Sequence, residues 1–169
     1  DRVLPTPLTF GATANVIEHV GATPVLADIA ADSFLIDPAA IEARITARTK
    51  AIIPVHFAGA PCEMDAINAI ASKHGVVVIE DAAHSLGGTF THGGKTYRAG
   101  SCEFSDFAIL SFHPGKPNPH AEGGAVLTQR PRAPRAFRRR RPHATPHHPT
   151  RPHAPHEAHA ETQAGAHAL

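Results

Sequence analysis

The chain has 169 residues, of which 42% are apolar and 18% are charged, and its formal net charge is +1. This composition is that of one globular domain of ordinary size. No apolar run approaches the roughly 18 residues that a membrane span requires, and no signal peptide opens the chain, so we expect a soluble, cytoplasmic protein. Cys62 and Cys102 lie far apart without CxxC spacing, which indicates two reduced thiols.

The charge is unevenly distributed along the chain. Residues 1–129 contain 8 Lys and Arg against 13 Asp and Glu, a net charge of −5, whereas residues 130–169 contain 8 Arg against 2 Glu, a net charge of +6. The second segment also holds 7 of the 14 His and 7 of the 16 Pro. It cannot bury enough apolar surface to offset the entropy of ordering it. We therefore predict one folded domain over 1–129 and a disordered Arg/His/Pro-rich tail over 130–169.

Apolar runs and helical patterns alternate along the first 129 residues. Helices are predicted over 12–20, from Asp37-Pro38 onward, and over 64–74 with Gly75 as its C-cap. Strands are predicted at 2–5, 24–29, 51–56, 76–80, 107–112 and 125–128. Strands that alternate with helices indicate an α/β domain with a mainly parallel sheet, covered on both faces.

One segment departs from this alternation. Residues 87–100 contain two short β-type runs on either side of Gly93-Gly94, which predicts a β-hairpin with a glycine turn. Gly93-Gly94-Lys95 also resembles part of a phosphate-binding loop, but the full glycine spacing and a following helix are missing. We therefore favour the hairpin.

Two chemically distinctive residues follow separate apolar strands. Asp81 closes the strand 76–80, and Lys116 lies in a loop after the strand 107–112. Ligands of open α/β sheets bind at the carboxyl ends of the strands, so this edge would bring the two residues together. An acid and a lysine so placed suit a pyridoxal phosphate (PLP) enzyme, in which the lysine carries the cofactor as a Schiff base and the carboxylate keeps the pyridine nitrogen protonated. Taken singly, Asp81 also suits a helix N-cap and Lys116 a solvated loop lysine.

Residues 1–129 resemble the middle of the large domain of the DegT-type sugar aminotransferases, which are PLP enzymes of fold type I. The resemblance covers about three quarters of the chain almost without gaps, and it implies a three-layer α/β/α architecture. It is carried by Thr6–Asn15, Gly21–Val25, Asp37-Pro38, Thr49–His56, Glu80–His84, Ser111–Lys116 and Glu122–Val126.

The resemblance implies a role for each matching site residue. Lys116 would be the Schiff-base lysine and proton carrier, and Asp81 would pair with the pyridinium nitrogen. Ser111 would donate its hydroxyl to the cofactor phosphate. His84 would lie near the cofactor ring and its phenolic oxygen, although it equally suits a capping residue. Glu122-Gly123-Gly124 would shape the turn that returns the chain to the sheet.

The same resemblance implies an activity. Such an enzyme moves an amino group, typically from L-glutamate, to a keto carbon of a nucleotide-linked sugar, in the biosynthesis of cell-surface polysaccharides or glycans. The segments 56–62 and 112–114 resemble the branch that acts at C4 of UDP-linked 4-keto-6-deoxy amino sugars. Enzymes of this kind build their sites across a homodimer.

The chain also departs from the family pattern. Family members begin before Asp1 and continue past Thr128 into a small domain, whereas this chain continues as the Arg/His/Pro-rich tail. We interpret the tail as an out-of-frame product of a GC-rich gene and the chain as an N-terminally incomplete remnant, whose own activity is an open question of the sequence. As an alternative, the cluster Phe137–Arg141 and the spaced histidines would make the chain a binding or regulatory module for a polyanion or a transition metal. The absence of interleaved aromatic residues argues against nucleic acid.

Overall fold

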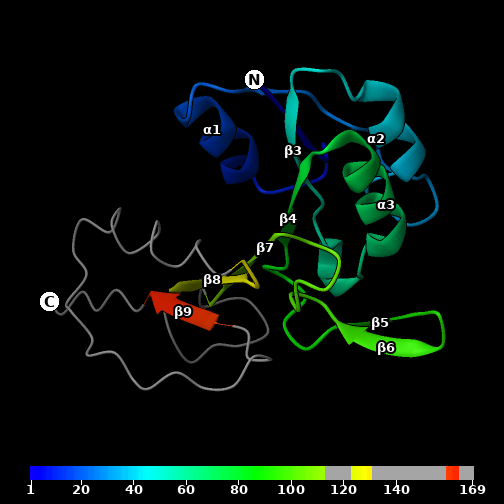
Figure 1. The fold of residues 1–169 in the computed structure, drawn as a ribbon. Helices are drawn as coiled ribbons and strands as arrows, with labels where there is room; N and C mark the ends of the chain where they lie inside the picture. Colours follow the sequence, from blue (N-terminus) through cyan, green and yellow to red (C-terminus); the bar gives the residue numbers. More distant parts are fainter. Residues whose placement is uncertain (113–122, 131–158, 164–169) are drawn as a thin grey trace, which may run out of the picture.

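The computed structural model describes residues 1–112, 123–130 and 159–163, the last of these as backbone (Figure 1). Helices and strands alternate through its first half, and strands dominate its second half. In chain order the elements are β1 (Arg2–Pro5), α1 (Gly11–His19), β2 (Thr23–Pro24), α2 (Pro38–Arg44), β3 (Thr49–Ile53), the 3-10 turn η1 (Phe57–Gly59), α3 (Met64–His74), β4 (Val77–Asp81), β5 (Thr89–His92), β6 (Lys95–Arg98), β7 (Phe107–Ser111), β8 (Gly124–Thr128) and β9 (His159–Gln163).

The main sheet has the strand order β2-β1-β3-β4-β7-β8-β9. The first five strands are parallel, and β8 and β9 are antiparallel additions at one side. The parallel strands β4 and β7 are direct neighbours, although the β5–β6 hairpin separates them in sequence. The predicted α/β class with a mainly parallel sheet is confirmed.

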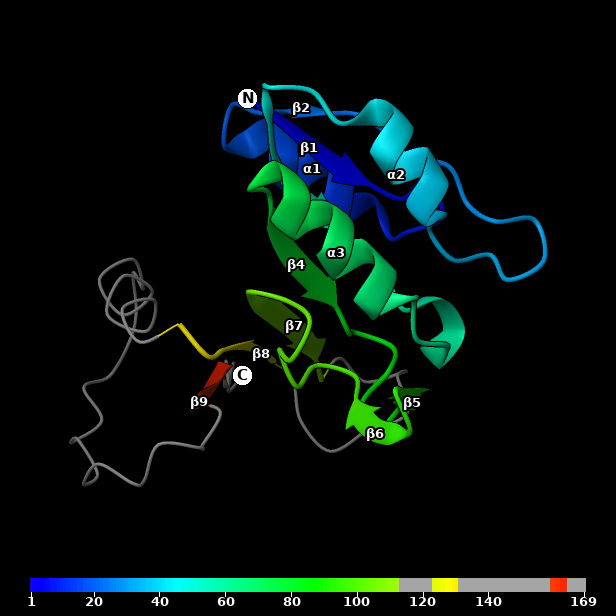
Figure 2. The same cartoon turned by 45° about the vertical axis from the view of Figure 1, so that its right-hand side comes forward.

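The sheet lies between two helical layers. Figure 2 shows α2 and α3 in front of the strands and α1 behind them. The register partners Leu4, Ile52 and Val78 point from three neighbouring strands to the α2–α3 side. There they form one buried cluster with Ile41 of α2 and Ile67 of α3. This cluster is the core of the domain, and the three-layer architecture that the resemblance implied is confirmed.

Two helix ends follow directly from the sequence. The Asp37 carboxylate accepts a hydrogen bond from the backbone N–H of Ala39 at 2.8 Å, and Pro38 occupies the first turn of α2. Gly75 closes α3 in the left-handed conformation, with φ of +65°. The predicted start of the second helix and the predicted range of the third are both confirmed.

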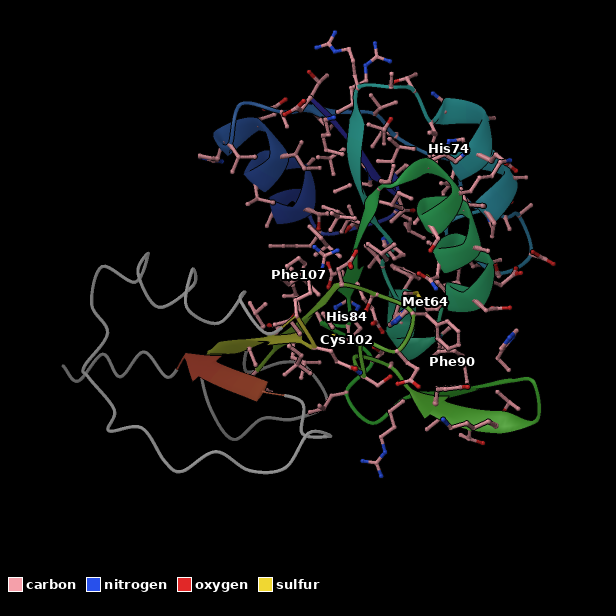
Figure 3. The ribbon with its side chains drawn as sticks, in the orientation of Figure 1. Met64, His74, His84, Phe90, Cys102 and Phe107 are labelled. Atoms are coloured by element: carbon pink, nitrogen blue, oxygen red, sulfur yellow. The ribbon has the colours of Figure 1, made fainter. Side chains whose placement is uncertain are left out.

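The predicted hairpin is also present. Strands β5 and β6 pair from Thr89↔Arg98 to His92↔Lys95, and both glycines of the intervening turn have positive φ. Phe90, labelled in Figure 3, packs against the core cluster, and so does Phe104. Gly93-Gly94-Lys95 is thus a hairpin turn, as the sequence predicted.

Strand β2 is shorter than the predicted run of 24–29. The backbone nevertheless stays beside β1, because the N–H groups of Val25 and Ala27 donate to the carbonyls of Val3 and Pro5. The donors to β1 alternate as Thr23, Val25 and Ala27, so the nitrogen of Pro24 faces away from β1 and its missing N–H leaves this pairing intact.

The tail was expected to be disordered, but its residues His159–Gln163 form β9, paired antiparallel with β8 from Gly124↔Gln163 to Thr128↔His159. Strand β8 has β7 on its other side, so backbone pairing at a free strand edge accounts for this addition. Residues 131–158 and 164–169 lie outside the described part of the chain. Among the described residues, no helix is both long enough and apolar enough to cross a membrane.

Candidate active site

Asp81 is the last residue of β4, at the carboxyl edge of the parallel sheet. Its Oδ1 accepts a hydrogen bond from the backbone N–H of Ala83 at 3.1 Å, and no other hydrogen bond to its carboxylate is present within the described residues. The described residues that follow Asp81 form turns up to β5, so the carboxylate caps a tight turn instead of a helix. It is partly exposed and one of its oxygens, Oδ2, remains available to a ligand.

Asp81 and Ser111 lie on the same face of the sheet. Asp81 is the register partner of Ile109 on β7, and register partners on neighbouring strands project to the same side. Ser111 follows Ile109 by two residues, so its side chain returns to that side. The carboxyl ends of β4 and β7 therefore present an acid and a hydroxyl together, on the face opposite α2 and α3. Ile109 itself is 39% exposed there.

Backbone contacts fix the end of β7. The N–H of Phe112 donates to the carbonyl of Gly123 at 2.9 Å, and Ser111 pairs with Gly124. A side chain at position 124 would bring its Cβ to 2.9 Å from the carbonyl oxygen of Leu110, which explains the glycine there. Lys116 and Glu122, which the resemblance assigned to this loop, lie outside the described residues.

His84 is exposed in the turn that follows β4 (Figure 3). Within the described residues its side chain makes no hydrogen bond or ion pair. The backbone around it is closely packed, because a Cβ added to Gly59 would lie 3.2 Å from the carbonyl oxygen of His84. The fold places His84 three residues beyond Asp81 without contact between the two side chains.

A buried polar network lies directly behind Asp81, and the sequence reasoning missed it. His56 is fully buried and Glu80 is 3% exposed. The Glu80 carboxylate accepts three hydrogen bonds: from Nε2 of His56 at 2.8 Å, from the backbone N–H of Gly100 at 2.6 Å and from the Ser105 hydroxyl at 2.8 Å. The available signal was the pair Glu80-Asp81 itself, since consecutive strand residues face opposite sides and one of the two acids had to point into the core.

The hydrogen bonds define the protonation of this pair. Nδ1 of His56 accepts a hydrogen bond from the backbone N–H of Cys62 at 3.0 Å, so this nitrogen carries no proton. The ring proton is therefore on Nε2, which donates it to Glu80. Burial alone would raise the pKa of Glu80, but the hydrogen bonds from His56 and Gly100 outweigh it and lower the pKa below its ordinary value. The pair is a neutral imidazole on an ionised carboxylate.

The two cysteines are buried close to this network. Burial, with a smaller contribution from the charge of Glu80, raises the pKa of Cys62 to about 12 and that of Cys102 to about 11. Both thiols therefore stay protonated at neutral pH. This agrees with the expected reduced thiols and gives neither of them a nucleophilic role.

Asp81 and Ser111, which the structure places on one face, are two of the residues to which the resemblance assigned cofactor contacts. The chain belongs to the DegT/DnrJ/EryC1/StrS aminotransferase family, whose profile matches residues 1–157. That match extends past Thr128, where the resemblance seen in the sequence ends. The family's members are PLP-dependent aminotransferases.

Relatives and solved structures agree with this assignment. The chain is 48% identical over 128 residues to the spore coat polysaccharide biosynthesis protein SpsC of Bacillus subtilis, covering 76% of this chain and 31% of SpsC. Among solved structures, DesV of S. venezuelae is 37% identical with a TM-score of 0.71 (82% of this chain, 36% of that chain). DesI, solved with its TDP-sugar product, is 38% identical with a TM-score of 0.64 (75% and 31%). PseC of Helicobacter pylori, involved in pseudoaminic acid biosynthesis, is 37% identical with a TM-score of 0.68 (75% and 32%). The chain thus spans about a third of the length of each.

Proposed function

We propose that this chain is the cofactor-binding part of a PLP-dependent aminotransferase that places an amino group on a keto carbon of a nucleotide-linked sugar. The observation that carries the proposal is the shared face of Asp81 and Ser111 at the carboxyl ends of β4 and β7. The membership of the chain in a sugar aminotransferase family supports it.

The donor set at this edge suits PLP. Asp81 offers a carboxylate oxygen with no other partner among the described residues, which fits the cationic pyridine nitrogen. Ser111 offers a hydroxyl for the phosphate. Ile109 is the register partner of Asp81 and precedes Ser111 by two residues on β7. Its partly exposed side chain offers apolar surface for the flat ring. When bound, the cofactor supplies an electron sink for the carbon that exchanges nitrogen.

The remaining roles fall to residues of this chain by resemblance. We assign the covalent cofactor link and the proton transfers to Lys116, whose amine gains or releases a proton as nitrogen is exchanged. His84, exposed in the turn after Asp81, is assigned to the ring and its phenolic oxygen. Asp81 holds the ring in place and keeps its nitrogen charged.

The substrate class is proposed from the relatives. SpsC is a polysaccharide biosynthesis protein, PseC acts in pseudoaminic acid biosynthesis, and DesI was solved with a TDP-sugar product. We propose a nucleotide-linked 4-keto sugar as amino acceptor, with a UDP-linked 4-keto-6-deoxy amino sugar as the first candidate, and L-glutamate as donor. We also propose a cytoplasmic homodimer, which light scattering of the purified protein would test.

Trapping of the cofactor tests the proposal. The full chain is incubated with PLP and reduced with borohydride, and the modified residue is found by peptide mass spectrometry. We expect one pyridoxyl adduct, on Lys116, and its loss in Lys116→Arg. Adducts spread over Lys50, Lys73 and Lys95, or none at all, would refute the proposed cofactor site.

A further inference from the structure

The two consecutive acids of β4 have separate environments. Asp81 faces the candidate cofactor side and is partly exposed, whereas Glu80 faces the α3 side and is buried. The partners of Glu80 come from three segments: His56 after β3, Gly100 after β6 and Ser105 before β7. All three donate to it, and none of them is a cation, given the neutral form of His56. A negative charge is thus retained in the interior immediately behind Asp81.

The same histidine also holds the backbone of Asp81. The N–H of His56 donates to the carbonyl of Asp81 at 3.1 Å, and the N–H of Asp81 donates to the carbonyl of Pro54 at 2.8 Å. On the other side, the N–H of Ala82 donates to the carbonyl of Ile109 at 2.9 Å. Asp81 is therefore clamped between β3 and β7, and the His56 side chain ties this clamp to Glu80.

We propose that His56 and Glu80 are positioning residues for Asp81: they fix its backbone and place a second, buried negative charge behind it, so that the two acids together stabilise a cation in front of Asp81. This inference rests on the proposed function, in which the cation is the protonated pyridine nitrogen. The carboxylates of Glu80 and Asp81 repel each other when no cation is near, and a cation bound in front of Asp81 relieves that repulsion.

Other ionisable groups near the two acids do not cancel this charge. Cys62 and Cys102 face Glu80 and remain protonated, since burial raises the pKa of both thiols. Asp106, on the approach to β7, is neutralised by its ion pair with Arg130. His84 is the exposed group in the turn beyond Asp81. Glu80 therefore remains as the charge that acts on Asp81 from inside the domain.

The first test uses the full chain without cofactor. Glu80→Gln keeps the shape of the side chain and removes its charge, and the Ser105 hydroxyl can turn to accept a bond from the new amide. The matched control is Glu63→Gln, at an exposed acid before α3. In amide hydrogen-exchange NMR we expect Glu80→Gln to lower the protection of the Asp81 and Ala82 N–H groups about tenfold, because hydrogen bonds to a charged acceptor are stronger than those to a neutral amide. Glu63→Gln should leave this protection unchanged. Equal protection of these two N–H groups in Glu80→Gln and wild type overturns the proposal.

A second measurement does not depend on the variant folding. In the wild-type chain, ¹⁵N NMR of the imidazole should show the His56 proton on Nε2 alone at neutral pH. A doubly protonated ring, or a proton on Nδ1 alone, would mean that the hydrogen-bonded His56–Glu80 pair carries no net negative charge. Either result would overturn the proposal.

The third measurement joins the inference to the cofactor. Pyridoxamine phosphate carries the same ring but forms no covalent bond with Lys116, so its binding is independent of the trapping experiment. With a ¹⁵N-labelled ring, we expect a protonated nitrogen in wild type and about tenfold weaker binding, with a less protonated nitrogen, in Glu80→Gln. Equal affinity and equal protonation in both proteins would refute the inference. If wild type does not bind the probe at all, the proposed function fails, and the amide-exchange comparison decides the inference alone.

Discussion

Asp81 and Ile109 are register partners on β4 and β7, so the two side chains emerge on the same face of the sheet, and Ser111 emerges there two residues later. This relationship turns a serine in a β-strand into a candidate phosphate ligand. A hydroxyl on the opposite face would point toward the layer of α2 and α3.

The first prediction concerns this hydroxyl. Ser111→Ala should weaken PLP binding about tenfold or more, because a hydrogen bond to a charged group contributes about 1.5–3 kcal/mol. The control is Ser72→Ala, at an exposed serine on α3. Dissociation constants from fluorescence titration decide the question, and equal affinity in Ser111→Ala and wild type would remove Ser111 from the site.

The second prediction concerns the contact between η1 and the turn that carries His84. Gly59 and Gly21 both have positive φ, +88° and +73°, so alanine costs about 1 kcal/mol of backbone strain at either position. Only Gly59 faces a close neighbour, the carbonyl oxygen of His84, at 3.2 Å from its added Cβ.

Gly59→Ala should therefore lower the free energy of unfolding more than Gly21→Ala does, and should also weaken PLP binding. Urea unfolding curves give the first comparison and cofactor titration the second. The same loss of stability in both variants, with unchanged cofactor binding, would show that the turn accommodates the extra methyl group.

The third prediction is an acid dependence of stability. The folded-state pKa of Glu80 lies below its ordinary value of 4.5, so its stabilising contribution is present above that pH and is lost as the pH falls through the folded-state pKa. Glu80→Gln should be less stable than wild type at pH 7, and the difference should shrink below pH 4.5. Urea unfolding at pH 7, 5 and 3 measures it, and a difference independent of pH would contradict the prediction.

The fourth prediction is the inertness of both thiols. Because the pKa of Cys62 is raised to about 12 and that of Cys102 to about 11, little thiolate forms at pH 8. Ellman's reagent should react slowly with the native chain and rapidly with two thiols in guanidinium. Unfolded thiols ionise near pH 9, so both residues also make unfolding more favourable as the pH rises from 9 toward 12. Rapid native labelling at pH 8 would show that the burial of these residues is not maintained in solution.

Local signals in the sequence predicted most of the architecture. Asp37-Pro38 and Gly75 mark helix ends by short-range hydrogen bonding and backbone preference, so they need no knowledge of the rest of the fold. Asp81 and Ser111 were found through strand ends and family motifs. Their common face needed the register of β4 against β7, which residue patterns do not specify.

The His56–Glu80 pair was not predictable in the same way. Its members lie 24 residues apart, and their contact depends on the parallel pairing that sets the end of β3 beside that of β4. Strand β9 was missed for a related reason. It contains no large apolar residue, and its pairing with β8 is made by backbone groups that every sequence provides.

The opposite facing of Glu80 and Asp81 limits the insertions and deletions that this gene segment can accept. Loss of a single codon for any of residues 77–79 would shift the strand by one position and exchange the faces of the two acids. Asp81 would then enter the interior, where its shorter side chain would leave His56, Gly100 and Ser105 without their acceptor. Glu80 would emerge on the ligand side. The turn at Gly93-Gly94 lies at the tip of an exposed hairpin and can change length without such an exchange. Length variation among natural variants of this domain should therefore collect in the hairpin and be absent from β4.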